Sequence, residues 1–227
     1  MKIQENSIAA GQIIGNLAER MDRDRGEEVH VSELIFCLRK AWLQRHGHKI
    51  TPDYDSILVF SVGLAMQAWL TGQLGDDVPV DLLGIVGTPD YIDPDGVINE
   101  LKATYASAGR DITGTPHYFD QLASYAIMKG QTKGRLVVFY VNGYYNFQRK
   151  VKIGTNERAV LKVFDVEWEQ EELDEWWEEM QERKDVLLNA TSIEEIPLDL
   201  HYSWECGYCP FKDVLCPGGG GRLEGRW

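Results

Sequence analysis

The most informative stretch of this chain reads Pro89-Asp90-Tyr91-Ile92-Asp93-Pro94-Asp95-Gly96-Val97-Ile98-Asn99-Glu100-Leu101-Lys102. Pro94 and Gly96 fit a type I turn in which proline takes the second position and glycine the left-handed bulge position. Such a turn closes a three-residue loop between Asp93 and Val97. We therefore predict a hairpin of two antiparallel strands around this loop.

The register of this hairpin decides whether its acidic side chains converge. A three-residue loop places Asp90 opposite Glu100, and Lys102 then lies on the same face of the hairpin. A two-residue turn would instead pair Asp90 with Asn99 and put the two carboxylates on opposite faces. The first register predicts two carboxylates and a lysine at one point of the sheet.

Two carboxylates on adjacent strands are oxygen ligands for a hard divalent cation such as magnesium or manganese. A lysine beside that cation can position an attacking water or help to deprotonate it. The pattern therefore predicts a hydrolytic phosphodiester site. The alternative interpretation is a half-exposed hairpin whose acidic residues and lysine form pairs across the strands.

The rest of the sequence alternates between helical and strand patterns, which predicts a mixed α/β domain. Helices are expected over residues 31–43, with Ser32 as the N-cap, and over 57–70 and 118–129. Strands are expected over residues 82–92, 97–103, 135–141 and 144–153. An Asn142-Gly143 turn is expected to join the last two strands as a hairpin.

Length and charge set further bounds. The 227 residues, 44% of them hydrophobic, predict one domain over residues 1–217 and a glycine-rich tail over 218–227. The net charge of -13 argues at face value against nucleic-acid partners, which normally require a basic surface, but residues 165–182 alone hold ten acidic residues and no Lys or Arg. Apolar residues at helical spacing predict that this acidic helix docks on the domain through Leu173, Trp177, Met180 and Leu187.

The chain contains four cysteines, one early and three near its end: Cys37, Cys206, Cys209 and Cys216. Their spacing predicts a single metal or iron-sulfur site that joins the two ends of the chain. Disulfides would require an oxidising compartment, whereas the N-terminal residues lack a signal pattern and no segment is apolar enough to span a membrane. We therefore expect a reduced, cytoplasmic protein without membrane association. Structural zinc remains an alternative, although the prolines after Cys209 and Cys216 favour iron-sulfur.

Taken together, Pro89-Asp90 and Glu100-Leu101-Lys102 resemble the signature of the PD-(D/E)XK nucleases, and Gln121-Leu122-Ala123-Ser124-Tyr125 resembles the Gln-x-x-x-Tyr helix of their RecB-like branch. The placement of the cysteines is similar to that in the CRISPR-associated RecB-like iron-sulfur exonucleases, the fourth Cas protein family. This resemblance covers residues 31–217. It implies a restriction-endonuclease-like core, in which helices flank a central mixed sheet and a cluster joins the N-terminal helix to the C-terminal cysteines.

The resemblance also implies roles for individual residues. Asp90, Glu100 and the carbonyl of Leu101 would bind magnesium or manganese, and Gln67, which stands where the family usually has histidine, would complete the site. Lys102 would help to activate water, while Gln121 and Tyr125 would contact or orient the DNA. The four cysteines would hold a structural [4Fe–4S] cluster in preference to [2Fe–2S]. A second departure from the family is Leu38, where proline commonly follows the first cysteine.

These observations predict a metal-dependent DNA exonuclease acting on single strands or free ends, in CRISPR spacer acquisition or in viral or recombination DNA processing. The basic candidates for the phosphate path are Arg39, Lys40, Arg45, Lys129, Lys133 and Arg135. The alternative is a weakly catalytic iron-sulfur subunit that binds DNA and docks on a CRISPR integrase or a recombination partner through its acidic helix. A third interpretation is a zinc-stapled protein without a catalytic site.

Overall fold

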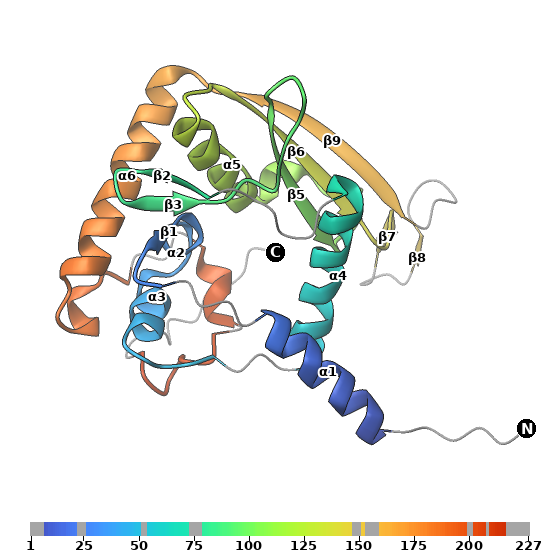
Figure 1. Cartoon of the computed structure of the whole chain (residues 1–227), viewed down its shortest axis with the longest axis horizontal. Helices are drawn as coiled ribbons and strands as arrows, with labels where there is room; N and C mark the ends of the chain where they lie inside the picture. Colours follow the sequence, from blue (N-terminus) through green and yellow to red (C-terminus); the bar gives the residue numbers. More distant parts are fainter. Residues whose placement is uncertain are drawn as a thin grey trace, which may run out of the picture.

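The computed structural model describes residues 7–21, 26–50, 54–72, 79–146, 151–152, 159–198, 202–207 and 209–216. Within these residues a four-stranded sheet, a three-stranded sheet and a two-stranded sheet are combined with helices (Figure 1). This is the mixed α/β architecture that the sequence predicts. The expected tail over 218–227 lies outside the described residues.

The four-stranded sheet carries the candidate site. Its order is β4 (Tyr91–Ile92), β5 (Ile98–Thr104), β6 (Lys133–Tyr140) and β9 (Val160–Glu167). Strands β5 and β6 are parallel, and the outer two pairs are antiparallel. The parallel pair is connected through α5 (Pro116–Met128), as a parallel connection requires a crossover segment. Alternate residues of β6 are buried, which is why this strand can hold helices against one face.

The three-stranded sheet corrects the strand expected over residues 82–92. It consists of β1 (Val29–His30), β3 (Ile85–Gly87) and β2 (Val80–Leu82), in that order. Leu83 and Gly84 both have positive φ, 53° and 77°, as a type I′ hairpin turn requires. The chain therefore reverses between β2 and β3. The single strand expected over residues 82–92 is replaced by β2, β3 and, in the four-stranded sheet, β4.

The hairpin expected at Asn142-Gly143 is also wrong. The antiparallel partner of β6 is β9, from Lys133 opposite Glu167 to Tyr140 opposite Val160. The carbonyl of Gly143 accepts a hydrogen bond from the amide of Ala108 at 2.7 Å, so the turn is tied to a loop rather than to a ladder. A separate pair is formed by β7 (Tyr145–Asn146) and β8 (Val151–Lys152). Residues 147–150 and 153 of the expected strand lie outside the described part of the chain.

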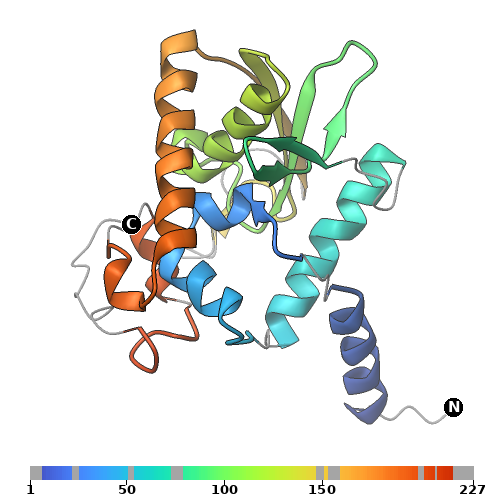
Figure 2. The ribbon, with the colours of Figure 1, turned by 60° about the vertical axis from the view of Figure 1, so that its left-hand side comes forward.

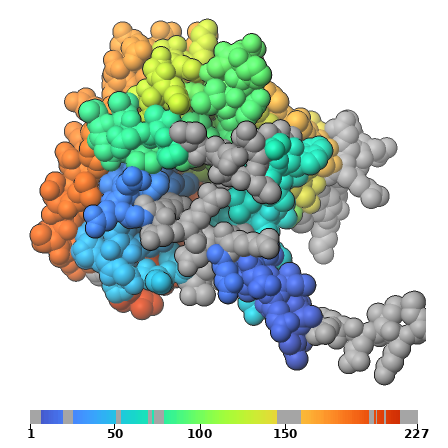
Figure 3. Space-filling view, viewed as in Figure 1, coloured from blue at the N-terminus to red at the C-terminus, as the bar shows by residue number. Residues whose placement is uncertain are grey.

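The helices surround these sheets. They are α1 (Ser7–Met21), α2 (Val31–Ile35), α3 (Leu38–Arg45), α4 (Tyr54–Thr71), α5 and α6 (Gln170–Asn189), with short 3-10 helices at η1 (Ile112–Gly114), η2 (Ile193–Glu195) and η3 (Ser203–Gly207). Helices α4 and α5 confirm two of the predictions. Figure 3 shows α1 projecting from the body of the molecule beside α4. None of the described helices combines the length and apolar character needed to cross a membrane.

The helix expected over residues 31–43 is broken in two, and Ser32 is not its N-cap. His30 precedes α2, and Cys37 is the extended N-cap residue of α3. Arg183 of α6 donates to the carbonyl of Leu34 at 2.5 Å and to that of Phe36 at 2.8 Å. A side chain distant in the sequence thus satisfies carbonyls at the end of α2, which allows the chain to leave the helix there.

The acidic helix docks as predicted. Leu173, Met180 and Leu187 of α6 are fully buried, and Trp177 is partly buried. Figure 2 shows α6 as a long orange helix along one side of the molecule. Its N-terminal half contacts α5, where the Nε1 of Trp176 donates to a side chain of that helix at 2.9 Å. Asp165 and Glu167, however, belong to β9, a strand that the sequence patterns do not predict.

Two glycines let α5 lie close to both sheets. A Cβ atom on Gly87 would lie 2.8 Å from Sδ of Met128 and 2.8 Å from Cε1 of Tyr125. A Cβ atom on Gly134 of β6 would lie 2.8 Å from Cδ1 of Leu122. Contacts of this length are repulsive, so glycine at both positions determines how near α5 comes to the candidate site.

Candidate functional site

The hairpin has the three-residue loop that the sequence favours. Tyr91 pairs with Asn99 and Ile92 with Ile98, which places Asp90 opposite Glu100. The amide of Asp93 donates to the carbonyl of Val97 at 3.0 Å, and Gly96 has a φ of 83°. The register that brings the two carboxylates together is therefore confirmed.

Asp90 and Glu100 are held by different means. Asp90 follows β3 in a bend and accepts a hydrogen bond from the amide of Leu101 at 2.7 Å. Glu100 lies within β5, where it is opposite Leu136 of β6, and only 1% of its side chain surface is exposed. The backbone of β5 thus fixes both acidic side chains.

Lys102 connects the carboxylates to α5. Its Nζ donates to Oε1 of Glu100 at 2.5 Å and to Oε1 of Gln121 at 2.8 Å. The amide nitrogen of Gln121 donates in turn to the hydroxyl of Tyr125 at 2.9 Å. The same ammonium lies 5.5 Å from the centroid of the Tyr118 ring. Three of the predicted catalytic residues, Lys102, Gln121 and Tyr125, therefore form one hydrogen-bonded network.

The charges and the burial of the carboxyl groups in this network favour the binding of a cation. Burial, and then the nearby charge of Asp90, raise the pKa of Glu100 to about 8, although Lys102 acts in the opposite direction. Oε2 of Glu100 is buried, and among the described residues it has no hydrogen-bond partner. A buried oxygen without a donor and a second carboxylate beside it are the conditions that a bound divalent cation relieves.

Lys102 keeps its proton. Burial alone would lower the pKa of this lysine, but the charge of Glu100, when that carboxyl is ionised, and the charge of Asp90 outweigh burial and raise it. The side chain is therefore an ammonium that donates hydrogen bonds. This favours positioning and charge stabilisation over proton abstraction as its chemical role.

The described side chains near the hairpin do not supply the complete coordination shell of a divalent cation. Within the described residues, no three His, Cys, Asp or Glu side chains are grouped as a metal site. Asp90 and Glu100 fit a magnesium or manganese ion as a pair, because both offer carboxylate oxygens. Gln67 lies half-buried on α4, a helix that contacts β5. The carbonyl of Leu101 belongs to β5 between Glu100 and Lys102.

Tyr125 is a core residue whose hydroxyl reaches the site. Its side chain is 5% exposed, and its ring packs against Gly87. A ring buried in this way does not stack on a nucleobase. The hydroxyl of Tyr125 instead orients Gln121, which makes it a positioning residue for the network.

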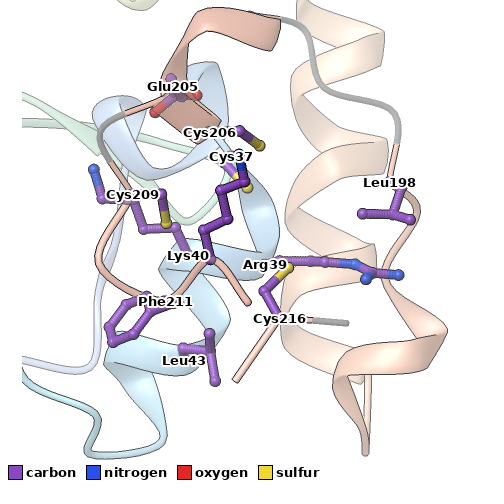
Figure 4. A pocket seen from close by; sticks show the side chains of 11 residues that line it. Cys37, Arg39, Lys40, Leu43, Leu198, Glu205, Cys206, Cys209, Phe211 and Cys216 are labelled. Atoms are coloured by element: carbon purple, nitrogen blue, oxygen red, sulfur yellow. The ribbon is translucent and has the colours of Figure 1, made fainter. Parts of the chain in front are cut away.

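The four cysteines lie around a second site. Cys37 at the start of α3 and Cys206, Cys209 and Cys216 from the C-terminal segment line one pocket (Figure 4). All four are free thiols, and burial raises the pKa of Cys37 and of Cys206. Neighbouring cysteines raise the pKa of Cys206 further, as expected where thiolates would repel one another. Four thiols around one space suit a soft metal centre, although no three of the described thiols are grouped as a metal site.

Several basic candidates for the phosphate path have other roles. Arg39 is buried and donates to the carbonyl of Ile196 at 2.8 Å. Arg45 pairs with Glu33 at 2.8 Å. Arg135 pairs with Asp93 at 3.0 Å and with Asp165 at 2.8 Å. These contacts are structural, so they weaken the case for a path built on the three arginines.

Two residues near these sites were missed by the sequence patterns. Glu205 is buried in the cysteine pocket, and one of its carboxylate oxygens has no hydrogen-bond partner among the described residues. Tyr118 lies beneath Lys102. The position of Glu205 directly before Cys206 was a usable signal, whereas the position of Tyr118 depends on how α5 packs.

Comparison with known proteins gives the following matches. The family model described as PD-(D/E)XK nuclease superfamily matches residues 4–217. No curated protein matches the chain. The solved structure of SSO0001 is 19% identical with a TM-score of 0.56, and the match covers 93% of this chain and 96% of that one. This likeness concerns the fold.

Two solved exonucleases match more distantly. The alkaline exonuclease LHK-Exo from Laribacter hongkongensis is 12% identical with a TM-score of 0.43, and the match covers 77% of this chain and 92% of that one. A phage-related exonuclease from Haemophilus somnus 129PT is 11% identical with a TM-score of 0.42, with 71% and 95% covered.

Proposed function

Because the chain belongs to the PD-(D/E)XK nuclease superfamily, we propose that it hydrolyses DNA phosphodiester bonds with magnesium or manganese at the Asp90 hairpin. The observation that carries this proposal is the network in which Lys102 joins the buried Glu100 to Gln121. A surface hairpin with incidental ion pairs would not bury a carboxylate whose second oxygen finds no hydrogen-bond partner in the described part of the chain. Burial of this kind is typical of a functional site.

Asp90, Glu100 and the Leu101 carbonyl would hold the cation, and Gln67 would complete the site from α4. When bound, the cation would supply charge neutralisation at the phosphate and a lower pKa for the attacking water. Glu100 loses its proton to take part. Lys102, held by Glu100 and Gln121, donates to the water or to a phosphate oxygen and so stabilises the charge that develops during attack. Tyr125 keeps Gln121 in place.

We infer that the four cysteines hold an iron-sulfur cluster, with [4Fe–4S] favoured over [2Fe–2S]. The shared pocket of Cys37, Cys206, Cys209 and Cys216 supports a single centre of soft ligands. Zinc uses the same ligand set, so iron analysis separates the two. The cluster would be structural, because the pocket joins the start of α3 to the C-terminal segment.

The preference for single strands or free ends follows from the resemblance of the helix at Gln121 and Tyr125 to the RecB-like branch. The same resemblance suggests a role in CRISPR spacer acquisition or in viral or recombination DNA processing, with an integrase or a recombination protein as partner. Cytoplasmic location is consistent with four free thiols.

A second candidate function is a weakly catalytic subunit that binds DNA and docks on such a partner. Two observations favour it. Gln67 replaces the usual histidine ligand, and Glu175, Glu178 and Glu182 present an exposed acidic face on α6. An amide oxygen is a neutral ligand, so cation binding at the hairpin would be weaker than with a charged one.

Anaerobically purified protein with manganese and end-labelled single-stranded DNA tests the proposal. Degradation of the linear strand by the wild type, and its loss in Glu100→Ala, would support the nuclease function. A covalently closed circular strand of the same sequence is the control for dependence on ends. Iron-loaded protein without Glu100-dependent cleavage would favour the docking subunit, and zinc-loaded protein would overturn the iron-sulfur assignment.

A further inference from the structure

A cluster of aromatic rings lies between the two sites. The ring of His117 is its centre, with centroids 6.0 Å from Phe36, 4.5 Å from Tyr118, 5.2 Å from Tyr202 and 5.4 Å from Trp204. These five rings come from three segments that are far apart in the chain. We call this set the ring cluster. Neither the cation site nor the cysteine pocket contains any of them.

One side of the ring cluster belongs to the cysteine segments. Phe36 directly precedes Cys37, and Trp204 lies in η3 just before Glu205 and Cys206. Burial raises the pKa of Glu205, and the backbone amide of Cys37 donates a hydrogen bond to its carboxylate, which acts in the opposite direction. The two cysteine-bearing segments are thus fastened to each other next to the ring cluster.

The other side of the ring cluster belongs to the first turns of α5. Tyr118 follows His117 and carries Lys102 over its ring. The hydroxyl of Tyr202 donates to Oδ2 of Asp120, which directly precedes Gln121. The segment of the cysteines is therefore hydrogen-bonded to the turn of α5 that holds the lysine.

We propose that the ring cluster couples the four-cysteine pocket to Lys102, with Tyr202 and His117 as positioning residues for phosphodiester cleavage. The coupling rests on the nuclease function proposed above. Filling the pocket orders the segment of Tyr202 and Trp204, which fixes the first turns of α5 and so the acceptor Gln121. Emptying the pocket releases Tyr202 and lets Gln121 and Lys102 move from their cleavage geometry.

A small movement of α5 would be enough to change the cleavage rate. A displacement of about 1 Å at a catalytic group can lower a rate about 100-fold. Nδ1 of His117 is buried and has no hydrogen-bond partner among the described residues, and the ring packs against the four other rings of the cluster. Burial, and then the charge of Lys102, lower the pKa of His117 to about 4, and the neutral ring is compatible with the ammonium nearby.

Tyr202→Phe tests the coupling, because it removes only the hydroxyl that reaches Asp120. Wild type and variant are each purified anaerobically and compared with the same protein treated with EDTA until iron and zinc are no longer detected. The treated samples are then freed of EDTA, and manganese is present in every cleavage assay. Hydrogen exchange of the backbone amides of residues 118–122 is measured in all four samples, together with kcat and KM on single-stranded DNA. Metal content shows that the variant keeps its pocket filled.

We expect emptying of the wild type to speed exchange at residues 118–122 and to lower kcat about tenfold at constant KM. Tyr202→Phe with a filled cysteine pocket should already show the faster exchange and the lower kcat. Emptying the pocket of this variant should change exchange and kcat little further. Asp120→Asn keeps an oxygen acceptor for Tyr202 and should behave as wild type, whereas Asp120→Ala should match Tyr202→Phe. Tyr144→Phe, whose ring faces Lys162 at 5.5 Å, is the control for loss of a hydroxyl elsewhere.

Two results would overturn the coupling. The first is a Tyr202→Phe variant with a filled pocket that has the hydrogen exchange and the kcat of the wild type. The second is that emptying the pocket changes exchange and kcat by the same factor in the variant and in the wild type. A purely structural hydrogen bond would lower the melting temperature and leave kcat unchanged. If the wild type shows no Glu100-dependent cleavage, the nuclease function fails, and the exchange at residues 118–122 still decides whether the pocket controls α5.

Discussion

Glu100 lies on β5 and Asp90 lies in a bend directly before the neighbouring strand β4, whereas the cysteines of the second site are brought together from the two ends of the chain. Strand β5, which carries Glu100, has a paired strand on each side, β4 and β6. The C-terminal cysteine segment instead depends on local turns. In one of them, the carbonyl of Phe211 accepts hydrogen bonds from the amides of Val214, Leu215 and Cys216.

The cores beneath the two sites differ in the same way. The hairpin is anchored in the main core, while Cys209 and Cys216 pack on a small cluster of three buried residues, Leu43, Ile193 and Phe211. A site built from strands is formed before its ligand arrives. A site built from turns on a small core obtains much of its order from the ligand itself. The hairpin should therefore keep its structure without the proposed cation, and the pocket should lose its structure without the proposed metal centre.

Lys102→Met is expected to have the largest effect. The variant removes the ammonium that joins Glu100 to Gln121 and leaves a side chain of similar length, so cleavage should fall about 100- to 1,000-fold. Manganese and DNA should still bind, because the carboxylates remain. Single-turnover cleavage and calorimetric titration with manganese measure the two properties. Unchanged cleavage by Lys102→Met would reject the site.

Cys209→Ser contrasts the two regions directly. Loss of one thiol should empty the pocket and lower the free energy of unfolding by about 3 kcal/mol, the stabilisation expected from a ligand at about 100 times its dissociation constant. Hydrogen exchange should rise over residues 202–216 and stay slow in β5 and β6. Equal loss of protection in the strands and the cysteine segment would show that the two regions unfold as one unit.

The same contrast explains what the sequence could predict. The hairpin register follows from residues within one turn of it, because Pro94 and Gly96 determine the loop. The periodicity of apolar residues in α5 and α6 is local as well. The break at Phe36 depends on Arg183, and the choice of β9 as partner of β6 depends on pairing across the whole domain. Such long-range choices leave no local pattern. The ring cluster could not be predicted from the sequence either, because its five rings come from three segments that are far apart in the chain.

Gly134→Ala tests how far the hairpin site depends on α5. The new methyl group would overlap the side chain of Leu122, and overpacking of this kind costs about 2 kcal/mol. The displaced helix should also lower kcat through Gln121. Gly15→Ala is the matched control, because a Cβ at that position in α1 meets no atom within 4 Å and should be neutral or slightly stabilising. Thermal unfolding of both variants measures the difference, and equal melting temperatures would contradict the close packing of α5.

The pH dependence of cation binding gives the smallest expected effect. Glu100 has a pKa of about 8 in the folded, metal-free protein, above its ordinary value of 4.5, so it is mostly protonated at pH 7. Its contribution to the stability of the metal-free protein is complete below pH 4.5 and is lost as the pH rises through 8. A cation must displace that proton, so manganese affinity should rise up to about tenfold per pH unit toward pH 8 and then level off.

Calorimetric titration with manganese at pH 6.5, 7.5 and 8.5 measures this slope, with Glu100→Gln as the variant that has no proton to lose. The variant should bind manganese more weakly and with little dependence on pH over the same range. A flat profile in the wild type would mean that Glu100 is already ionised in the metal-free protein. In that case Lys102 would outweigh burial and Asp90, and the hairpin would be a neutralised ion pair rather than a site prepared for a cation.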